Sequence, residues 1–276
     1  MITIGTGEDY ASVARTKEAG PWSTFPDFHS RFKPPVRPSE SDVASIRAAI
    51  AGSEAEVVLL GVTPELASLG DRLTAVDHSP QAVAKIWPGD NHQRRAVVAD
   101  WRDMPLKSGS ADAVIGDGSL NAIAEGLPDL LVEIARVLSP SGRLAVRAFC
   151  SPDEPETLES LRRSVIDGEE THIDAFRWRL VMALAALRPD WIVSVAELPE
   201  ALNAMFADRG ALSRVTGWTE DDLETIDSYV RATHRLVFPP LGRLLEIAKP
   251  VFGKSAVFAN GPYPLCERCP TVVLSR

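Results

Sequence analysis

The sequence has few cysteines, which excludes a fold held together by disulfides. Its 276 residues contain only Cys150, Cys266 and Cys269, a small number that fits a reducing compartment. Cys266 and Cys269 have the C-x-x-C spacing that can supply half of a tetrahedral zinc site, but the sequence has no second pair of this kind. We therefore predict free thiols and no bound metal, and we leave open whether these cysteines have a role.

Long apolar runs and an excess of positive charge are also missing. No run approaches the roughly 20 apolar residues of a membrane span, and residues 1–20 lack the basic and apolar regions of a secretory signal. The formal charge of -9 would repel a polyanion. These absences predict a soluble, cytoplasmic protein with neither a membrane nor a nucleic acid as partner.

What the chain does have is a regular alternation of apolar runs and helical patterns. The runs are rich in aliphatic and β-branched residues, as in strands buried on both faces. Such strands joined by helical crossovers form a doubly wound, mostly parallel α/β layer. The predicted strands are 57–62, 72–77, 94–100, 111–117 and 142–149, and the predicted helices between them are 64–71, 79–87 and 127–138.

The pattern differs on either side of this layer. Residues 1–38 look irregular, with many aromatic and proline residues, and are read either as an arm that packs over a site or as a surface arm. Ser39 and Asp42 then resemble a capping box for a helix over 40–51.

After residue 150 the chain is predominantly helical. Helical patterns at 151–168, 169–187, 198–210 and 219–236 interrupt the alternation, and a further one follows at 241–252. Two short apolar runs, 254–260 and 271–276, should pair antiparallel because the connection between them is short. The predicted units are an arm (1–38), the α/β domain (39–150 and 236–276) and an inserted helical lid (151–235).

Acidic residues end three of the predicted strands. They are Asp77, Asp100 and Asp117. Ligands of such sheets bind outside the carboxyl ends of the strands, where these carboxylates would stand in a row. They therefore predict a ligand with several hydroxyl and amino groups.

The loop after the first strand argues against a dinucleotide. It reads Gly61-Val62-Thr63-Pro64-Glu65 and keeps only the first glycine of the G-x-G-x-x-G pattern that brings backbone amides close to a pyrophosphate. An acidic Glu65 at the last glycine position would repel phosphate.

Together these segments resemble the class I S-adenosylmethionine-dependent methyltransferases. The resemblance covers about 55–149 and extends to the final hairpin, and it rests on the 61–65 loop, LTAVDHSPQAV, DWRDMPL, SADAVIGDGSLNAI and LLVEIARVLSPSGRLAV. It implies a seven-stranded Rossmann-like fold, S-adenosyl-L-methionine as cofactor and transferase activity. The implied cofactor-binding residues are Gly61, Val62, Thr63, Asp77, His78, Asp100, Trp101, Asp117, Gly118 and Ser119.

The resemblance assigns separate roles to the acids. Asp77 binds the ribose hydroxyls and Asp100 the adenine amino group, which agrees with the ability of a carboxylate to accept several hydrogen bonds. Asp117 marks the loop where cofactor and acceptor meet. The alternatives are a helix cap at Asp77, since Asp is a preferred N-cap residue, and a core position for Trp101.

The sequence also departs from the family pattern. Leu59 replaces a usual acidic residue, Ser141 stands where a glycine is expected, and Thr63 and Glu65 replace the later glycines of the loop. The Glu65 side chain must therefore point away from the cofactor.

The helical segment 151–235 is the predicted lid over a small-molecule acceptor. In-line methyl transfer depends on alignment and exclusion of water, so a general base is not required. The catalytic candidates are His172, Tyr229 and His234, and His172 also suits a helix cap. Trp178 is a further position to test, although its helical spacing is also typical of a core residue.

Two other functions stay open at this stage. One is another adenosyl-cofactor transferase, such as an aminopropyl transferase. The other is a non-catalytic subunit that binds the cofactor or a partner protein. The acceptor, the methylated atom and the oligomeric state, including a homo-oligomer, are not defined by the sequence. If the last strand lies antiparallel to the fifth, Cys269 should approach Cys150.

Overall fold

A seven-stranded sheet organises the molecule, for which a computed structural model describes residues 25–276. The strand order is β3-β2-β1-β4-β5-β9-β8, with β1 to β5 parallel and β9 antiparallel to both β5 and β8. The strands are β1 (Glu56–Leu60), β2 (Arg72–Asp77), β3 (Arg94–Val98), β4 (Ala111–Asp117), β5 (Leu138–Arg147), β8 (Lys254–Phe258) and β9 (Thr271–Ser275). The predicted mostly parallel sheet and its antiparallel final pair are confirmed.

Helices cover both faces of this sheet, because alternate residues of its central strands point to opposite sides. Val57 and Leu59 pack toward the side of α3 (Glu40–Ala49). Val58 and Leu60 pack toward the side of α5 (Leu127–Val137) and α11 (Leu241–Ala248). The remaining elements of this unit are η2 (Pro64–Leu66), α4 (Pro80–Lys85), α5 (Leu127–Val137), α11 (Leu241–Ala248) and η4 (Cys266–Arg268).

Local sequence explains where these helices begin. Ser39 and Asp42 form the predicted capping box at the start of α3, and the Ser79 side chain caps α4 by accepting from the Ala82 N–H. The expected helix over 64–71 is only the single 3-10 turn η2. Gly70 with a φ of +113° lies in this stretch, a conformation that an α-helix does not accommodate.

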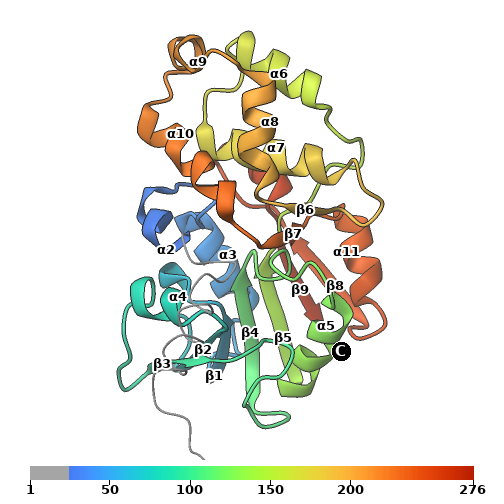
Figure 1. Ribbon diagram of the computed structural model, residues 1–276. Coiled ribbons are helices and arrows are strands. Elements are labelled where there is room, and N and C mark those ends of the chain that lie inside the picture. The colour runs from blue at the N-terminus through green and yellow to red at the C-terminus, as the bar shows by residue number, and fades with distance from the viewer. Residues whose placement is uncertain (1–24) are drawn as a thin grey trace, which may run out of the picture.

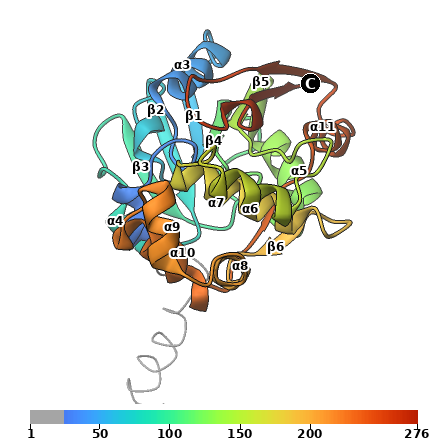
Figure 2. The same ribbon diagram turned by 90° about the horizontal axis from the view of Figure 1, so that it is seen from above.

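A mainly helical layer lies across the end of the sheet toward which β4 points (Figures 1 and 2). Its core is a separate cluster of buried side chains, which Phe149 and Cys269 of the sheet unit also join. The elements are α6 (Leu158–Ile166), α7 (Ile173–Ala185), β6 (Ile192–Ser194), α8 (Glu197–Met205), α9 (Arg209–Thr216), α10 (Glu220–Asp227), η3 (Ser228–Arg231) and β7 (Arg235–Val237).

Two sequence expectations for this layer were wrong. The predicted helix over 198–210 is split, because Asp208 accepts from the Ala211 N–H and starts α9 as a new helix. The predicted helix over 219–236 ends at η3, and the following residues form β7, which pairs antiparallel with β6. The layer therefore contains a two-stranded sheet that the helical pattern did not reveal.

The described part of the N-terminal arm packs between the two layers. Residues 25–31 form α2 (Phe25–Phe28) and η1 (His29–Arg31), so this part is more regular than expected. Phe32 and Val36 are buried in the core of the helical layer, and the Lys33 N–H donates to the Asp174 carboxylate at 2.9 Å. This packing favours the reading in which the arm covers a site, and residues 1–24 of the arm lie outside the described residues.

Candidate functional site

A cavity lies between the carboxyl ends of the central strands and the helical layer. Its empty volume, mouth included, is about 1060 Å³, at the top of the range for small-molecule sites. Ten of the thirteen residues predicted to bind the cofactor or to act in catalysis line it: Gly61, Thr63, Asp77, His78, Trp101, Asp117, Gly118, Ser119, Tyr229 and His234.

Three other predicted residues are not among the lining residues. Val62 is buried, and Asp100 lies outside the cavity lining. His172 is the N-cap of α7, where its Nδ1 accepts from the Ala175 N–H at 3.3 Å. His172 is thus a helix cap, which was the alternative to a catalytic role.

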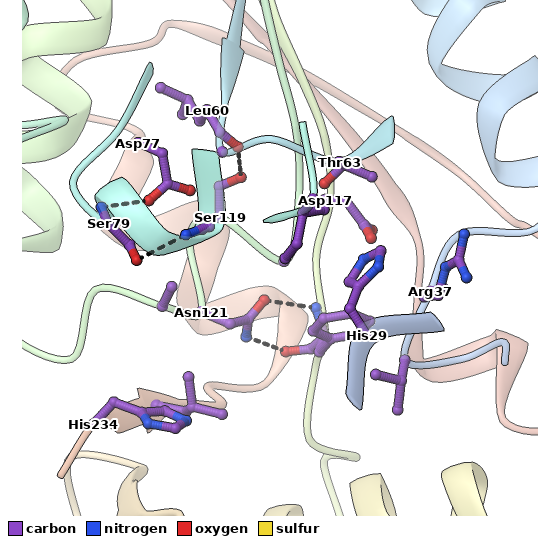
Figure 3. Close-up of a pocket in the computed structure, with 18 of the residues that line it drawn as sticks. His29, Arg37, Leu60, Thr63, Asp77, Ser79, Asp117, Ser119, Asn121 and His234 are labelled. Atoms are coloured by element: carbon purple, nitrogen blue, oxygen red, sulfur yellow. Dashed lines mark hydrogen bonds between the residues drawn. The ribbon is translucent and has the colours of Figure 1, made fainter. Parts of the chain in front are cut away.

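Asp77 stands at the end of β2 with its side chain 13% exposed. Its Oδ1 accepts from the Ser79 N–H at 2.8 Å (Figure 3), while a Cβ on Gly61 would lie 3.9 Å from its Oδ2. Burial raises the pKa of Asp77 above its ordinary value. Because Ser79, and not Asp77, is the N-cap of α4, the cap alternative for Asp77 does not hold.

The glycine-poor loop after β1 keeps its acidic side chain away from the cavity. Glu65 accepts from the Arg37 Nε at 2.8 Å and does not line the cavity. Gly61 has a φ of +103° and a Cβ there would lie 3.8 Å from the Trp101 ring, so this position favours glycine. The loop thereby lets Asp77 and Trp101 face the same space, and the outward orientation expected of Glu65 is confirmed.

Asp100 and the neighbouring Trp101 have different environments. Asp100 accepts two hydrogen bonds from the Arg102 guanidinium at 3.0 and 2.6 Å, and these bonds lower the pKa of Asp100. The Trp101 indole N–H donates to the Val76 carbonyl, and its side chain is both buried and part of the cavity wall. Trp101 is therefore a core residue and a lining residue at once.

Asp117 belongs to a buried ion-pair network that the sequence patterns did not reveal. Both of its oxygens accept from the guanidinium of Arg147 on β5. Arg147 also contacts Asp42 at 3.4 Å and the Tyr263 hydroxyl at 3.3 Å, and that hydroxyl donates to Asp42 at 2.9 Å. Burial raises the pKa of Asp117 in spite of the Arg147 charge.

The loop after β4 connects the two layers. The Ser119 hydroxyl donates to the Leu60 carbonyl at 2.8 Å (Figure 3). The Asn121 amide donates to the carbonyls of Phe149 and Val237, each at 2.7 Å, and its oxygen accepts from the Phe149 N–H at 2.9 Å. One side chain thus joins the end of β5 to β7 of the helical layer.

The wall contributed by the helical layer is aromatic. Trp178 from α7, Tyr229 from η3, and His234 are 8%, 5% and 5% exposed, and all three line the cavity together with Phe238. Burial raises the pKa of Tyr229. The interior end of the cavity is thus enclosed by side chains that are themselves hidden from solvent.

Sequence reasoning missed several residues of this site. Their signals were present only in part. Arg147 is a charged residue within an apolar stretch of its strand, and His29 and Arg37 lie in the arm, for which packing over a site was one of two readings. Burial and the nearby Arg37 charge lower the pKa of His29. The missed residues are His29, Arg37, Asn121, Arg147, Phe149 and Phe238.

The cysteines lie as the topology predicted. The backbone N–H of Cys150 donates to the Arg268 carbonyl at 2.8 Å, next to Cys269. Burial raises the pKa of both thiols to about 12. Within residues 25–276, no group of three or more His, Cys, Asp or Glu side chains is arranged to hold a metal ion. No helix in that same range is long and apolar enough to cross a membrane.

Comparisons with known proteins agree with this architecture. Residues 61–146 match the model of a methyltransferase domain family. Comparison of the sequence with curated proteins finds no significant match.

Two solved structures illustrate the shared fold. A protein from Rhodobacter sphaeroides named as a Zn-dependent alcohol dehydrogenase has 14% identity and a TM-score of 0.59, over 94% of this chain and 98% of that one. The CcbJ methyltransferase from Streptomyces caelestis has 13% identity and a TM-score of 0.52, over 93% and 98%. At such identities these likenesses show the fold alone.

The matched segment runs from the 61–65 loop into β5 and contains the strand ends that carry Asp77 and Asp117. Residues 61–146 of the chain are therefore similar to a methyltransferase domain, and this match covers about a third of the chain.

Proposed function

We propose that this protein is a methyltransferase that acts on a small molecule held in the cavity between the sheet unit and segment 151–235. The observation that carries the proposal is the buried wall that the helical layer adds to the cavity, since Trp178, Tyr229 and His234 line it and are each less than a tenth exposed. A macromolecular substrate would need an open groove at this place. The division into a cofactor unit (39–150 and 236–276) and an acceptor lid (151–235) is part of the proposal.

The end of the cavity near β1 and β2 suits the adenosyl group. Asp77 Oδ2 faces the glycine at the loop start, where a ribose diol can donate two hydrogen bonds to a carboxylate. The Trp101 ring offers an apolar surface for a purine. The Asp77 carboxylate, which has no cationic partner as close as that of Asp117, favours a cationic ligand, and this fits a sulfonium. Asp100 can accept a hydrogen bond from the adenine amino group only if its own bonds to Arg102 rearrange.

The chain's residues would promote transfer mainly by positioning. S-adenosylmethionine, when bound, supplies the electrophilic methyl group. Asp77 and the 61–63 loop hold one end of the cavity, and the Asp117–Ser119 loop lies between that end and the lid residues. Of the catalytic candidates, Tyr229 and His234 line the cavity, and a neutral imidazole at His234 can take a proton from an acceptor. The buried aromatic wall would limit the access of water to the reacting groups.

Calorimetric titration with S-adenosylhomocysteine tests the cofactor half of this proposal. Native protein should bind in about the micromolar range. Asp77→Ala should weaken binding at least about tenfold, because two ribose hydroxyls lose a charged acceptor.

Asp71→Ala is the matched control. Asp71 is exposed at the opposite end of β2, so its removal should leave the affinity unchanged. Native protein without measurable affinity, or equal affinity in Asp77→Ala, would refute the assignment.

A further inference from the structure

One tryptophan in the cavity wall has a polar atom that the protein does not satisfy. The Trp178 side chain is 8% exposed, and its Nε1 has no hydrogen-bond partner among residues 25–276. Leaving a buried N–H without an acceptor costs about 1–3 kcal/mol. The Nε1 atom itself is closed to solvent, but the Trp178 side chain lines the cavity, so a ligand that shifts this ring can supply the acceptor.

Other tryptophans of the chain show that this is not a general feature of its core. Trp218, in the same helical layer and 4% exposed, donates from Nε1 to the Thr171 carbonyl at 2.7 Å. Trp101 donates to Val76 and Trp87 donates to Asp90. A purely structural Trp178 would be expected to have such a partner too.

The surroundings of Trp178 are aromatic. Its ring centroid lies 4.9 Å from that of Phe149, with the planes 45° apart, and 5.6 Å from that of Phe238, with the planes 57° apart. Tyr229 and His234 meet edge to face at 6.0 Å beside them. These tilted rings present faces and edges that favour a further aromatic ring.

This part of the cavity also lacks fixed charge. The lining residues from the helical layer and the segment after it are Trp178, Tyr229, His234, Leu236 and Phe238, and none of them carries a permanent charge. The charged lining groups lie toward the sheet. There, Arg37 is paired with Glu65 and Asp117 with Arg147. The Arg147 guanidinium lies 5.0 Å from the Phe149 ring centroid but is bound to Asp117, so a carboxylate or an ammonium group would find no unpaired permanent charge there.

We infer that the acceptor substrate is a neutral, flat aromatic molecule with a hydrogen-bond acceptor, a ring nitrogen or a carbonyl, that receives the Trp178 indole N–H. The inference rests on the proposed function and specifies its acceptor. Phe149, Trp178 and Phe238 contact the ring system, and the acceptor atom distinguishes this ligand from a plain hydrocarbon. Trp178 is a specificity residue in this arrangement.

Equilibrium dialysis with three matched probes tests the inference, with and without saturating S-adenosylhomocysteine. The probes are 6-hydroxyquinoline, 2-naphthol and decahydro-2-naphthol, which share a bicyclic frame. The first has a ring nitrogen, the second lacks it and the third is not aromatic. Native protein should bind 6-hydroxyquinoline about tenfold more tightly than 2-naphthol, and decahydro-2-naphthol most weakly.

Two variants separate recognition from packing. Trp178→Phe keeps an aromatic ring but removes the N–H, so the preference for 6-hydroxyquinoline over 2-naphthol should fall to about twofold or less. Trp218→Phe alters a buried tryptophan that does not line the cavity and should keep the full preference. The ratio of two affinities in one variant is insensitive to a general loss of stability.

The possible outcomes are distinct. The inference is overturned if no aromatic probe binds with a dissociation constant below about 1 mM, or if decahydro-2-naphthol binds as tightly as the aromatic probes. It is also overturned if Trp178→Phe keeps the preference for 6-hydroxyquinoline. Displacement of the aromatic probes by spermidine, a polycation, would show a site for charged ligands and would overturn it too. S-adenosylhomocysteine titrated alone decides the cofactor assignment separately. Probe binding with the predicted preference but without cofactor binding would refute the proposed function and retain the aromatic site.

Discussion

At the scale of single residues, the three aspartates at the strand ends differ in what they are bonded to. Asp100 forms an ion pair with Arg102, and Asp117 forms one with Arg147. Asp77 accepts the Ser79 N–H through one oxygen and turns the other toward Gly61. Asp77 is therefore the member of the three best prepared to bind hydroxyl groups of a ligand.

Arg147 offers a stability test at this scale. Arg147→Met would leave Asp117 and Asp42 buried without their cation, and the free energy of unfolding should fall by about 3–5 kcal/mol. Arg143→Met, on the same strand but partly exposed with a single bond to the Ala49 carbonyl, should cost about 1 kcal/mol. Denaturant titration measures both, and equal losses would contradict a central role for the network.

The loss of unfolding free energy in Arg147→Met, called the deficit below, should depend on pH because of the pKa of Asp117. Burial raises this pKa in the native protein, and loss of Arg147 raises it further. The folded variant then binds protons that the unfolded chain releases, so its stability increases as the pH falls. The deficit of Arg147→Met should shrink from about pH 8 to about pH 5. A constant deficit would argue against buried, unpaired carboxylates as its cause.

At the scale of elements, the apolar runs predicted the seven-stranded sheet well, because β-branched and aliphatic residues buried on both faces leave a clear pattern. Runs of three residues such as β6 and β7 leave none. Their pairing, Val193 with Leu236, depends on contacts between distant segments. The break between α8 and α9 has a local signal, the capping Asp208, which the continuous helical pattern obscured.

The candidate site was predictable to a similar extent. Side chains at strand ends, such as Asp77 and Ser119, could be placed because topology brings those ends together. The ion-pair partners of buried charged residues could not be assigned in this way. Arg147 and Asp42 are 105 positions apart in the chain, and a strand pattern indicates burial without identifying what a buried charge contacts.

The link that Asn121 forms between the end of β5 and β7 can be tested by its effect on stability. Asn121→Ala would leave the Phe149 N–H and two carbonyls without these bonds, and we expect a loss of at least about 2 kcal/mol in unfolding free energy. Asn203→Ala removes an exposed amide that accepts from Arg209 and should change stability by less than about 0.5 kcal/mol. Comparable effects of the two variants would show that the link does not hold the layers together.

At the scale of the whole molecule, the layers form one continuous structure around the cavity. Phe32 from the arm and Phe149 and Cys269 from the sheet unit share the core of the helical layer. The formal charge of -9 and the Asp77 carboxylate at the sheet end of the cavity are compatible with a cationic cofactor. The uncharged aromatic end next to it suits the acceptor. Two ligands of different chemistry therefore have adjacent places in one enclosed space.

A crystal structure of the protein with S-adenosylhomocysteine and 6-hydroxyquinoline tests this central claim most directly. The account predicts the ribose hydroxyls on Asp77, the purine against Trp101, and the quinoline nitrogen within hydrogen-bond distance of Trp178 Nε1. S-adenosylhomocysteine bound outside the cavity, or oriented with its adenine against Trp178 and His234, would contradict it.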